Sequence, residues 1–184
     1  MSERGKMGVI QAISVDDFIA AMHVIKQAVR VISEDVVFLP MRAQSARAAL
    51  DSAVRSATAA RDLEAAKLAD SALDDAILLC VASESLVKSC SEFSNAAVDS
   101  FSKLGALQMA WNSDEIAGQA EAVEKSAAVV ADVIESCLAG VKKLLSLDSP
   151  SVEEEAMFAR AALEKMSASA DDALASIKSL WDGD

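Results

Sequence analysis

The 184-residue sequence predicts an all-α protein, an antiparallel up-and-down helical bundle of four to five long helices. Three observations predict this fold. Apolar residues recur at alternating spacings of three and four, which places them along one face of a helix. The chain contains only 2 Pro and 6 Gly, too few for the many turns of a sheet protein. Aromatic residues make up 4% and Tyr is absent, whereas Ala, the strongest helix former, recurs throughout.

The first helix is expected to begin after Ser14. Residues 1–13 are expected to form a flexible N-terminal segment, and residues 14–184 a single helical-bundle domain. Ser14 with Asp17 three positions later is typical of a helix N-cap, and Pro40 is expected to end the helix. Its apolar face is Val15, Phe18, Met22, Ile25, Val29, Ile32, Val36 and Leu39.

Residues 41–104 contain neither Gly nor Pro. A single helix over this range would be roughly 95 Å long, so we expect a break near Asp70 and Ser71, although the pattern leaves one helix as the alternative. Ser71 would cap the new helix, with Asp74 and Asp75 in its first turn. Before the break the apolar face is thin and rich in alanine: Ala46, Leu50, Ala53 or Val54, Ala57 and Ala60. After it the face is thicker: Leu79, Ser83, Leu86, Cys90, Phe93, Ala97, Phe101 and Leu104.

Two further helices are expected after a connection at residues 105–113. Ser113 would cap the first of them, and residues 147–151 form the next loop. There Ser151 and Glu154 have the spacing of a capping box, and Pro150 suits a first helical turn. The apolar faces are Ile116, Ala120, Val123, Ala127, Val130, Ile134, Cys137, Val141 and Leu144, then Val152, Ala156, Ala159, Leu163, Met166, Ala170, Ala173, Ile177 and Leu180. Short loops predict antiparallel neighbours, packed at about 20°.

The charge distribution excludes some partners. The formal net charge is −12. Residues 1–67 hold 9 Lys or Arg and 8 Asp or Glu, a net +1, whereas residues 68–184 hold 8 and 21, a net −13. Such an acidic surface repels the phosphates of nucleic acid and of anionic membranes, so no nucleic-acid partner is expected. No apolar stretch approaches the roughly 20 residues of a transmembrane helix.

The N-terminal residues and the cysteines predict the compartment. Residues 1–11 lack the apolar core of a signal peptide. The three cysteines are expected to be reduced and to fill the core. A cytoplasmic location is therefore expected, with leaderless secretion as an open alternative.

No catalytic or metal-binding constellation is expected. His23 is the only histidine, and a di-iron or zinc site needs several His or Cys ligands. The carboxylate pairs at 16–17, 74–75 and 171–172 are interpreted as helix caps or solvated side chains. Neither a nucleophile with a general base nor a glycine-rich phosphate loop is present. We therefore expect no enzymatic activity, no cofactor and no metal, with a helical enzyme that uses only carboxylates and arginines as the alternative.

Two groups of residues are candidates for interaction. Four arginines gather in one stretch of an acidic chain: Arg42, Arg47, Arg55 and Arg61. They would form a docking surface for an acidic partner, or would pair with neighbours such as Asp51, Asp62 and Glu64 or with other helices. Trp111 falls in an expected loop, where an exposed Trp often marks an interface; alternatively it plugs the end of the bundle.

The chain resembles three helical families. Its Ala and Ser content resembles that of vinculin- and talin-type rod modules, and its size and Ala content are similar to those of phasins, which coat polyester granules. The stretch Leu107–Ser113 (LQMAWNS) resembles the Trp-x-Gly turn of secreted WXG-type hairpins, with Ser113 in place of the Gly.

The function expected from elimination is a non-enzymatic module that binds another protein or a copy of itself. One alternative is a phasin-like coat on an apolar or lipid surface, suggested by the mean hydropathy of +0.28. A second alternative is a secreted helical effector without a cleavable signal.

Overall fold

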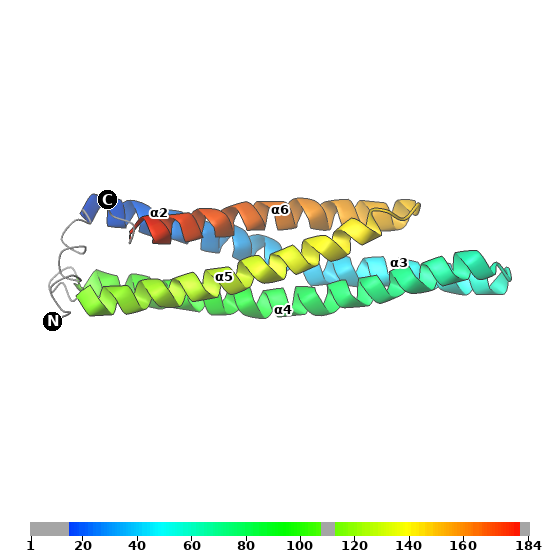
Figure 1. The fold of residues 1–184 in the computed structure, drawn as a ribbon, viewed down its shortest axis with the longest axis horizontal. Coiled ribbons are helices and arrows are strands. Elements are labelled where there is room, and N and C mark those ends of the chain that lie inside the picture. The colour runs from blue at the N-terminus through cyan, green and yellow to red at the C-terminus, as the bar shows by residue number, and fades with distance from the viewer. Residues whose placement is uncertain (1–14, 108–112, 181–184) are drawn as a thin grey trace, which may run out of the picture. The chain divides into compact units, whose positions relative to one another are not determined.

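The computed structural model describes residues 15–107 and 113–180, which form five α-helices. They are α2 (Val15–Val36), α3 (Leu39–Ala59), α4 (Leu63–Leu107), α5 (Ser113–Leu144) and α6 (Pro150–Ser179) (Figure 1). Strands are absent from these described ranges. The helices pack against one another, so the predicted all-α bundle is confirmed.

The chain divides into two compact units. Unit 1 comprises Met1–Ser33, Ser89–Ala131 and Ala168–Asp184, and unit 2 comprises Glu34–Lys88 and Asp132–Ser167. The helices α2, α4, α5 and α6 contribute residues to both units, whereas α3 lies wholly in unit 2. The single domain expected from the sequence remains a prediction.

Most of the predicted apolar faces form the core, but the predicted positions Ala53 and Ala57 of α3, and Ala60 directly after it, are not buried. All nine positions predicted for α6 are buried, from Val152 to Leu180, and so are the positions from Leu79 to Ala97 on α4 and from Val123 to Leu144 on α5. In α2 the packed face is rotated: Ala21 and Ala28 are buried, whereas Phe18 and Met22 are only half-buried. Alanine lets neighbouring helices approach closely, so the larger side chains lie at the edge of the contact.

Pro40 begins a helix, contrary to the prediction that it ends one. It lies in the first turn of α3, and α2 ends four residues earlier at Val36. A proline nitrogen has no hydrogen to donate to the carbonyl of residue i−4, and its ring clashes with that carbonyl. The hydrogen-bond ladder is therefore interrupted at Val36 and resumes where the N–H of Arg42 donates to the carbonyl of Phe38, at 3.1 Å.

The turn between α3 and α4 lies at residues 60–62. The N–H of Arg61 donates to the carbonyl of Thr58 and the N–H of Asp62 to that of Ala57, both at 3.1 Å, which is the Schellman pattern. Arg61 adopts the left-handed conformation, with φ 59°. Asp62 then caps α4, because its Oδ1 accepts the N–H of Ala65 at 3.1 Å.

The predicted break near Asp70 and Ser71 is therefore wrong, since α4 runs through both residues. Asp74 and Asp75 lie inside the helix rather than in its first turn. Asp75 instead forms an ion pair with Lys143 of α5, at 2.9 Å.

The connection between α5 and α6 lies close to its predicted place. α5 begins at Ser113, the residue that was predicted to cap it, and α6 begins at Pro150. The carbonyl of Ser149 accepts the N–H of Glu153 at 2.9 Å, so Ser149 holds the N-cap position. The predicted capping box is therefore wrong, because Ser151 is already inside the helix.

The core predicts a large cost for a single truncation in α6. Leu163 is fully buried in unit 2, so Leu163→Ala should lower the free energy of unfolding by about 2–5 kcal/mol. Leu78→Ala is the matched control, because Leu78 is 63% exposed, and should cost less than about 0.5 kcal/mol. Urea denaturation measures both, and equal losses would contradict the assignment of the packed face.

The left-handed residue in the turn predicts a stabilising substitution. Arg61→Gly should raise the free energy of unfolding by about 0.5–1 kcal/mol, because glycine has no Cβ to clash at φ 59°. Arg61→Ala should bring no such gain, since alanine keeps the Cβ. A urea midpoint for Arg61→Gly below that of Arg61→Ala would show that the turn does not have this conformation.

Candidate interaction surface

Arg42 makes a contact between helices rather than an open docking surface. Its Nη1 lies 2.7 Å from Oε2 of Glu155 on α6, and the two side chains are 30% and 20% exposed. Its guanidinium carbon lies 4.1 Å from the centroid of the Phe158 ring, in cation–π geometry. Arg42 therefore attaches the start of α3 to the start of α6, which is the internal pairing that the sequence left open.

The other three arginines are exposed. Arg55 pairs with Asp51 one turn earlier on α3, and such an exposed pair contributes little to stability. The charge of Arg47 lowers the pKa of Cys80 on α4, although burial of that thiol raises the pKa more strongly. Arg61 lies in the turn described above.

The four arginines consequently do not form one patch. At about 100° per residue, Arg42 and Arg47 lie about 140° apart around α3. Trp111, the remaining candidate, lies outside the described residues.

The sequence prediction missed the large apolar side chains that remain exposed. Among the large apolar side chains that the structure describes, Leu63 is the most exposed at 75%, and two further leucines of α4, Leu68 and Leu78, are 64% and 63% exposed. Others that are more than half exposed are Val37, Met41, Val81, Val98 and Met157. The sequence held a signal for these residues, because they are large and apolar and none of them belongs to a predicted apolar face.

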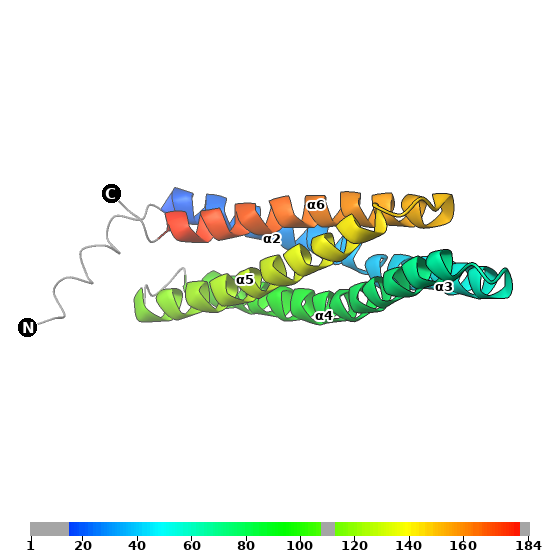
Figure 2. The ribbon, with the colours of Figure 1, turned by 45° about the vertical axis from the view of Figure 1, so that its right-hand side comes forward.

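One stretch of unit 2 has no core. We call residues 51–71 the α3–α4 overhang; all of them are described, and not one of their side chains is buried. Lys143 contacts Asp75, and Glu155 contacts Arg42, so α5 ends and α6 begins before the overhang is reached. Figures 1 and 2 show α3 and α4 continuing past the α5–α6 connection. Among the described residues, the two helices of the overhang therefore pack only against each other.

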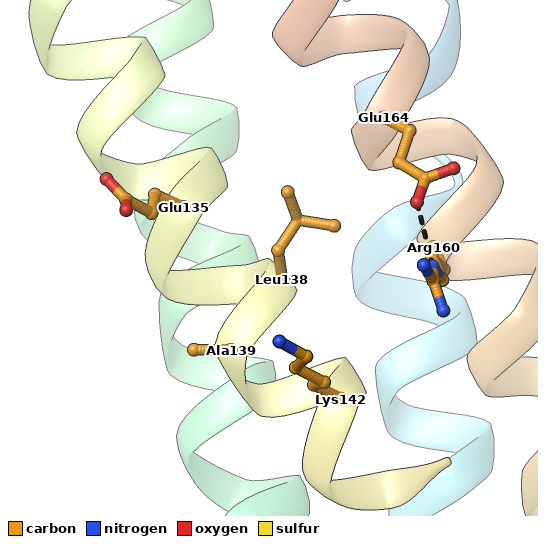
Figure 3. A pocket seen from close by; sticks show the side chains of 6 residues that line it. All are labelled: Glu135, Leu138, Ala139, Lys142, Arg160 and Glu164. Atoms are coloured by element: carbon orange, nitrogen blue, oxygen red, sulfur yellow. Dashed lines mark hydrogen bonds and ion pairs between the residues drawn. The ribbon is translucent and has the colours of Figure 1, made fainter.

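A charged groove lies between α5 and α6 in unit 2. It has a volume of about 340 Å³ and is lined by Glu135, Leu138, Ala139, Lys142, Arg160 and Glu164. Figure 3 shows Leu138 projecting from α5 toward α6, where Arg160 and Glu164 are joined by an ion pair of 2.8 Å. Its two basic and two acidic residues balance, so the groove does not select a ligand by net charge.

A second groove, between α4 and α5, is more apolar. It has a volume of about 490 Å³, and its lining includes Leu78, Val81 and Val133. The ion pair between Asp75 and Lys143 lies at its lining as well. Both grooves are open to solvent rather than enclosed, so they suit contact with another surface better than sequestration of a small substrate.

The buried thiols are poor nucleophiles. Burial raises the pKa of Cys137 to about 11, while a side-chain hydrogen bond with Ser83 acts in the opposite direction. Burial likewise raises the pKa of Cys80. Reactive cysteines have a lowered pKa and partial exposure, so these two thiols fill the core, as predicted.

The raised pKa of Cys137 predicts a loss of stability at high pH. In the unfolded chain this thiol ionises near its ordinary value of 9.0, whereas in the folded chain it stays protonated up to about 11. Its contribution is therefore fully present below pH 9 and is lost as the pH rises toward 11, by about 2–3 kcal/mol. Urea denaturation at pH 8 and pH 10.5 measures the slope. Cys137→Ala should reduce the loss of unfolding free energy between these two pH values, because the cost of the cavity does not vary with pH. The same loss in the variant and in the unaltered protein would contradict the raised pKa of Cys137.

Across the described ranges, groups of three or more His, Cys, Asp or Glu that could hold a metal ion are absent. Within the same ranges, the helices lack the combination of length and apolarity that crossing a membrane requires. Comparison of the chain with known protein families, with curated proteins and with solved structures gives no match.

Proposed function

We propose that this chain is a non-enzymatic helical bundle that acts by binding another protein or a second copy of itself. The observation that carries the proposal is the exposure of large apolar side chains along α4, with Leu63, Leu68 and Leu78 each more than half exposed. Exposed apolar groups that gather on one element are typical of protein-binding surfaces. An enzyme would use a different kind of site, a concave pocket with convergent polar groups.

The ionisable groups support the same proposal. The charged side chains named above either form ion pairs across or along helices or lie on the surface. The thiols of Cys80 and Cys137 are buried, and their raised pKa disfavours the reactive thiolate.

A coat on an apolar or lipid surface is the second candidate. The same exposed side chains and the mean hydropathy of +0.28 favour it. The two functions differ in how the helices respond. A protein-binding bundle keeps its own core when an apolar surface is offered, whereas a coat opens or adsorbs in order to place its apolar faces on that surface.

Flotation with oil droplets distinguishes the two functions. Full-length protein is mixed with triolein droplets coated with neutral phosphatidylcholine and then centrifuged. We expect the protein to stay in the aqueous layer with an unchanged circular dichroism spectrum. Flotation with the droplets, together with a gain of helix, would favour the coat instead.

Affinity capture tests the partner directly. Full-length protein and its Leu78→Lys, Val81→Lys variant are immobilised and exposed to lysate of the native host. The substitutions add charge at exposed positions, so the fold should persist. We expect the unaltered protein to retain a partner, or further copies of the chain itself. That binding should be lost from the Leu78→Lys, Val81→Lys variant or from a Leu68→Lys variant. Retention of nothing by any form, with a monomer at every concentration, would contradict the proposal.

A further inference from the structure

We propose that the α3–α4 overhang pairs with the overhang of a second copy of this chain, in an antiparallel arrangement about a two-fold axis. Each copy would supply the two helices that α5 and α6 provide elsewhere in unit 2. This inference rests on the proposed function, of which it names the partner and the surface.

The register of the core continues into the overhang after the core itself has ended. On α3 the buried positions from Leu39 to Leu50 follow alternating spacings of four and three, which continue through Ala53, Ala57 and Ala60. On α4 the buried series that begins at Ala72 extends backward through Ala69 and Ala65. These five alanines are half-buried or exposed. They hold core positions at a level where only two of the four helices are present.

Leu68 shows which neighbour is missing. It lies one turn before buried Ala72 and two turns before Asp75, on the side of α4 where Asp75 contacts Lys143 of α5. Because α5 ends at Leu144, directly after that contact, nothing in unit 2 covers Leu68, which is 64% exposed. A helix that continued the line of α5 would cover it.

The overhang of a second copy would supply two helices of the right length where α5 and α6 are absent. Residues 51–60 span about 15 Å at about 1.5 Å per residue, and the opposing part of α4 has a similar length. Two overhangs that overlap in opposite directions restore a four-helix section over that length. The alanines let the facing helices approach closely, and the two-fold axis makes each contact occur twice.

Particular charged side chains at the two ends of the overhang can pair between the copies, although Asp62 and Glu64 leave the tip without a net positive charge. In the antiparallel arrangement the tip of each overhang meets the α5–α6 connection of the other copy. The tip carries Arg61, and the connection carries Asp148 with Glu153 in the first turn of α6. Near the tip, Glu64 would approach Lys142 in the last turn of α5. These side chains are exposed, so their attraction should weaken with added salt.

The size of the surface sets the expected strength. A standard interface uses roughly 20–30 residues on each side, and only one face of the overhang takes part here. We therefore expect a dimer that dissociates on dilution rather than an obligate one.

Sedimentation velocity over a dilution series of the full chain tests the apolar part. The unaltered protein should show a monomer–dimer equilibrium. Leu68→Lys should raise the dissociation constant by about tenfold or more. The matched control Val98→Lys also introduces a lysine at a similarly exposed apolar position of α4, but in unit 1 and outside the proposed binding residues, and should leave the constant unchanged. Circular dichroism confirms that each variant keeps its helices.

A charge exchange tests the antiparallel arrangement. Arg61→Glu alone, and Asp148→Lys with Glu153→Lys alone, should each weaken the dimer, because both ends then repel. An equimolar mixture of the two variants should dimerise again, because opposite charges then meet at both ends. Failure of the mixture to recover would overturn the arrangement.

The outcomes also separate this inference from the proposed function. A protein that stays monomeric at every concentration, or a Val98→Lys variant as impaired as Leu68→Lys, would overturn the overhang pairing. In either case a different protein retained in the affinity capture would leave the proposed function standing.

Discussion

The rest of the structure depends on the burial of one apolar face along each helix. Fully burying a leucine or isoleucine side chain contributes about 1.5–3 kcal/mol. Each helix buries an apolar residue every three or four positions, and the contribution is smaller where that residue is alanine. In unit 2 the faces of α3, α4, α5 and α6 meet, and fully buried Leu86, Ile134, Leu144 and Leu163 fill the space between them. The ion pairs lie at the edges of this packing. Arg42 with Glu155, and Asp75 with Lys143, join helices that the core has already brought together.

The sequence predicted the faces well because the period of a helix is a local property. The position of every core residue of α6 follows from the spacing that begins at Val152, whatever the helix packs against. The turn at Arg61 was missed because a left-handed residue that ends a helix is usually glycine, and here an arginine adopts φ 59°. The prediction that Pro40 ends a helix was wrong, because a proline disrupts the hydrogen bond to the carbonyl four residues earlier and is itself tolerated in a first helical turn. The Arg55–Asp51 ion pair can be predicted from the sequence, because its residues are one helical turn apart. The Arg42–Glu155 pair cannot, because its residues are 113 positions apart in the sequence.

The same locality explains why the candidate surface could not be predicted. A spacing of three and four shows which face of a helix seeks partners, but not how far along the chain those partners extend. Ala53 and Ala57 continue the face of Leu50 without a change of pattern. Burial nevertheless stops at Leu50, because neither α5 nor α6 extends along α3 beyond that level. An exposed surface of this kind is defined by the lengths of other helices, and those depend on where each connection falls in space.

The composition of the overhang links its stability to its proposed pairing. A helix pair that meets through alanine buries less apolar area per turn than the leucine- and isoleucine-filled layers of unit 2, so its order depends more on intrinsic helix propensity. Regions with few buried contacts open at a lower free-energy cost than the core. A partner that binds only the ordered form stabilises it by mass action. Association of two overhangs would therefore also order them, and the exposed Leu68 would stabilise the dimer in a stretch of unit 2 where the monomer has no buried side chains.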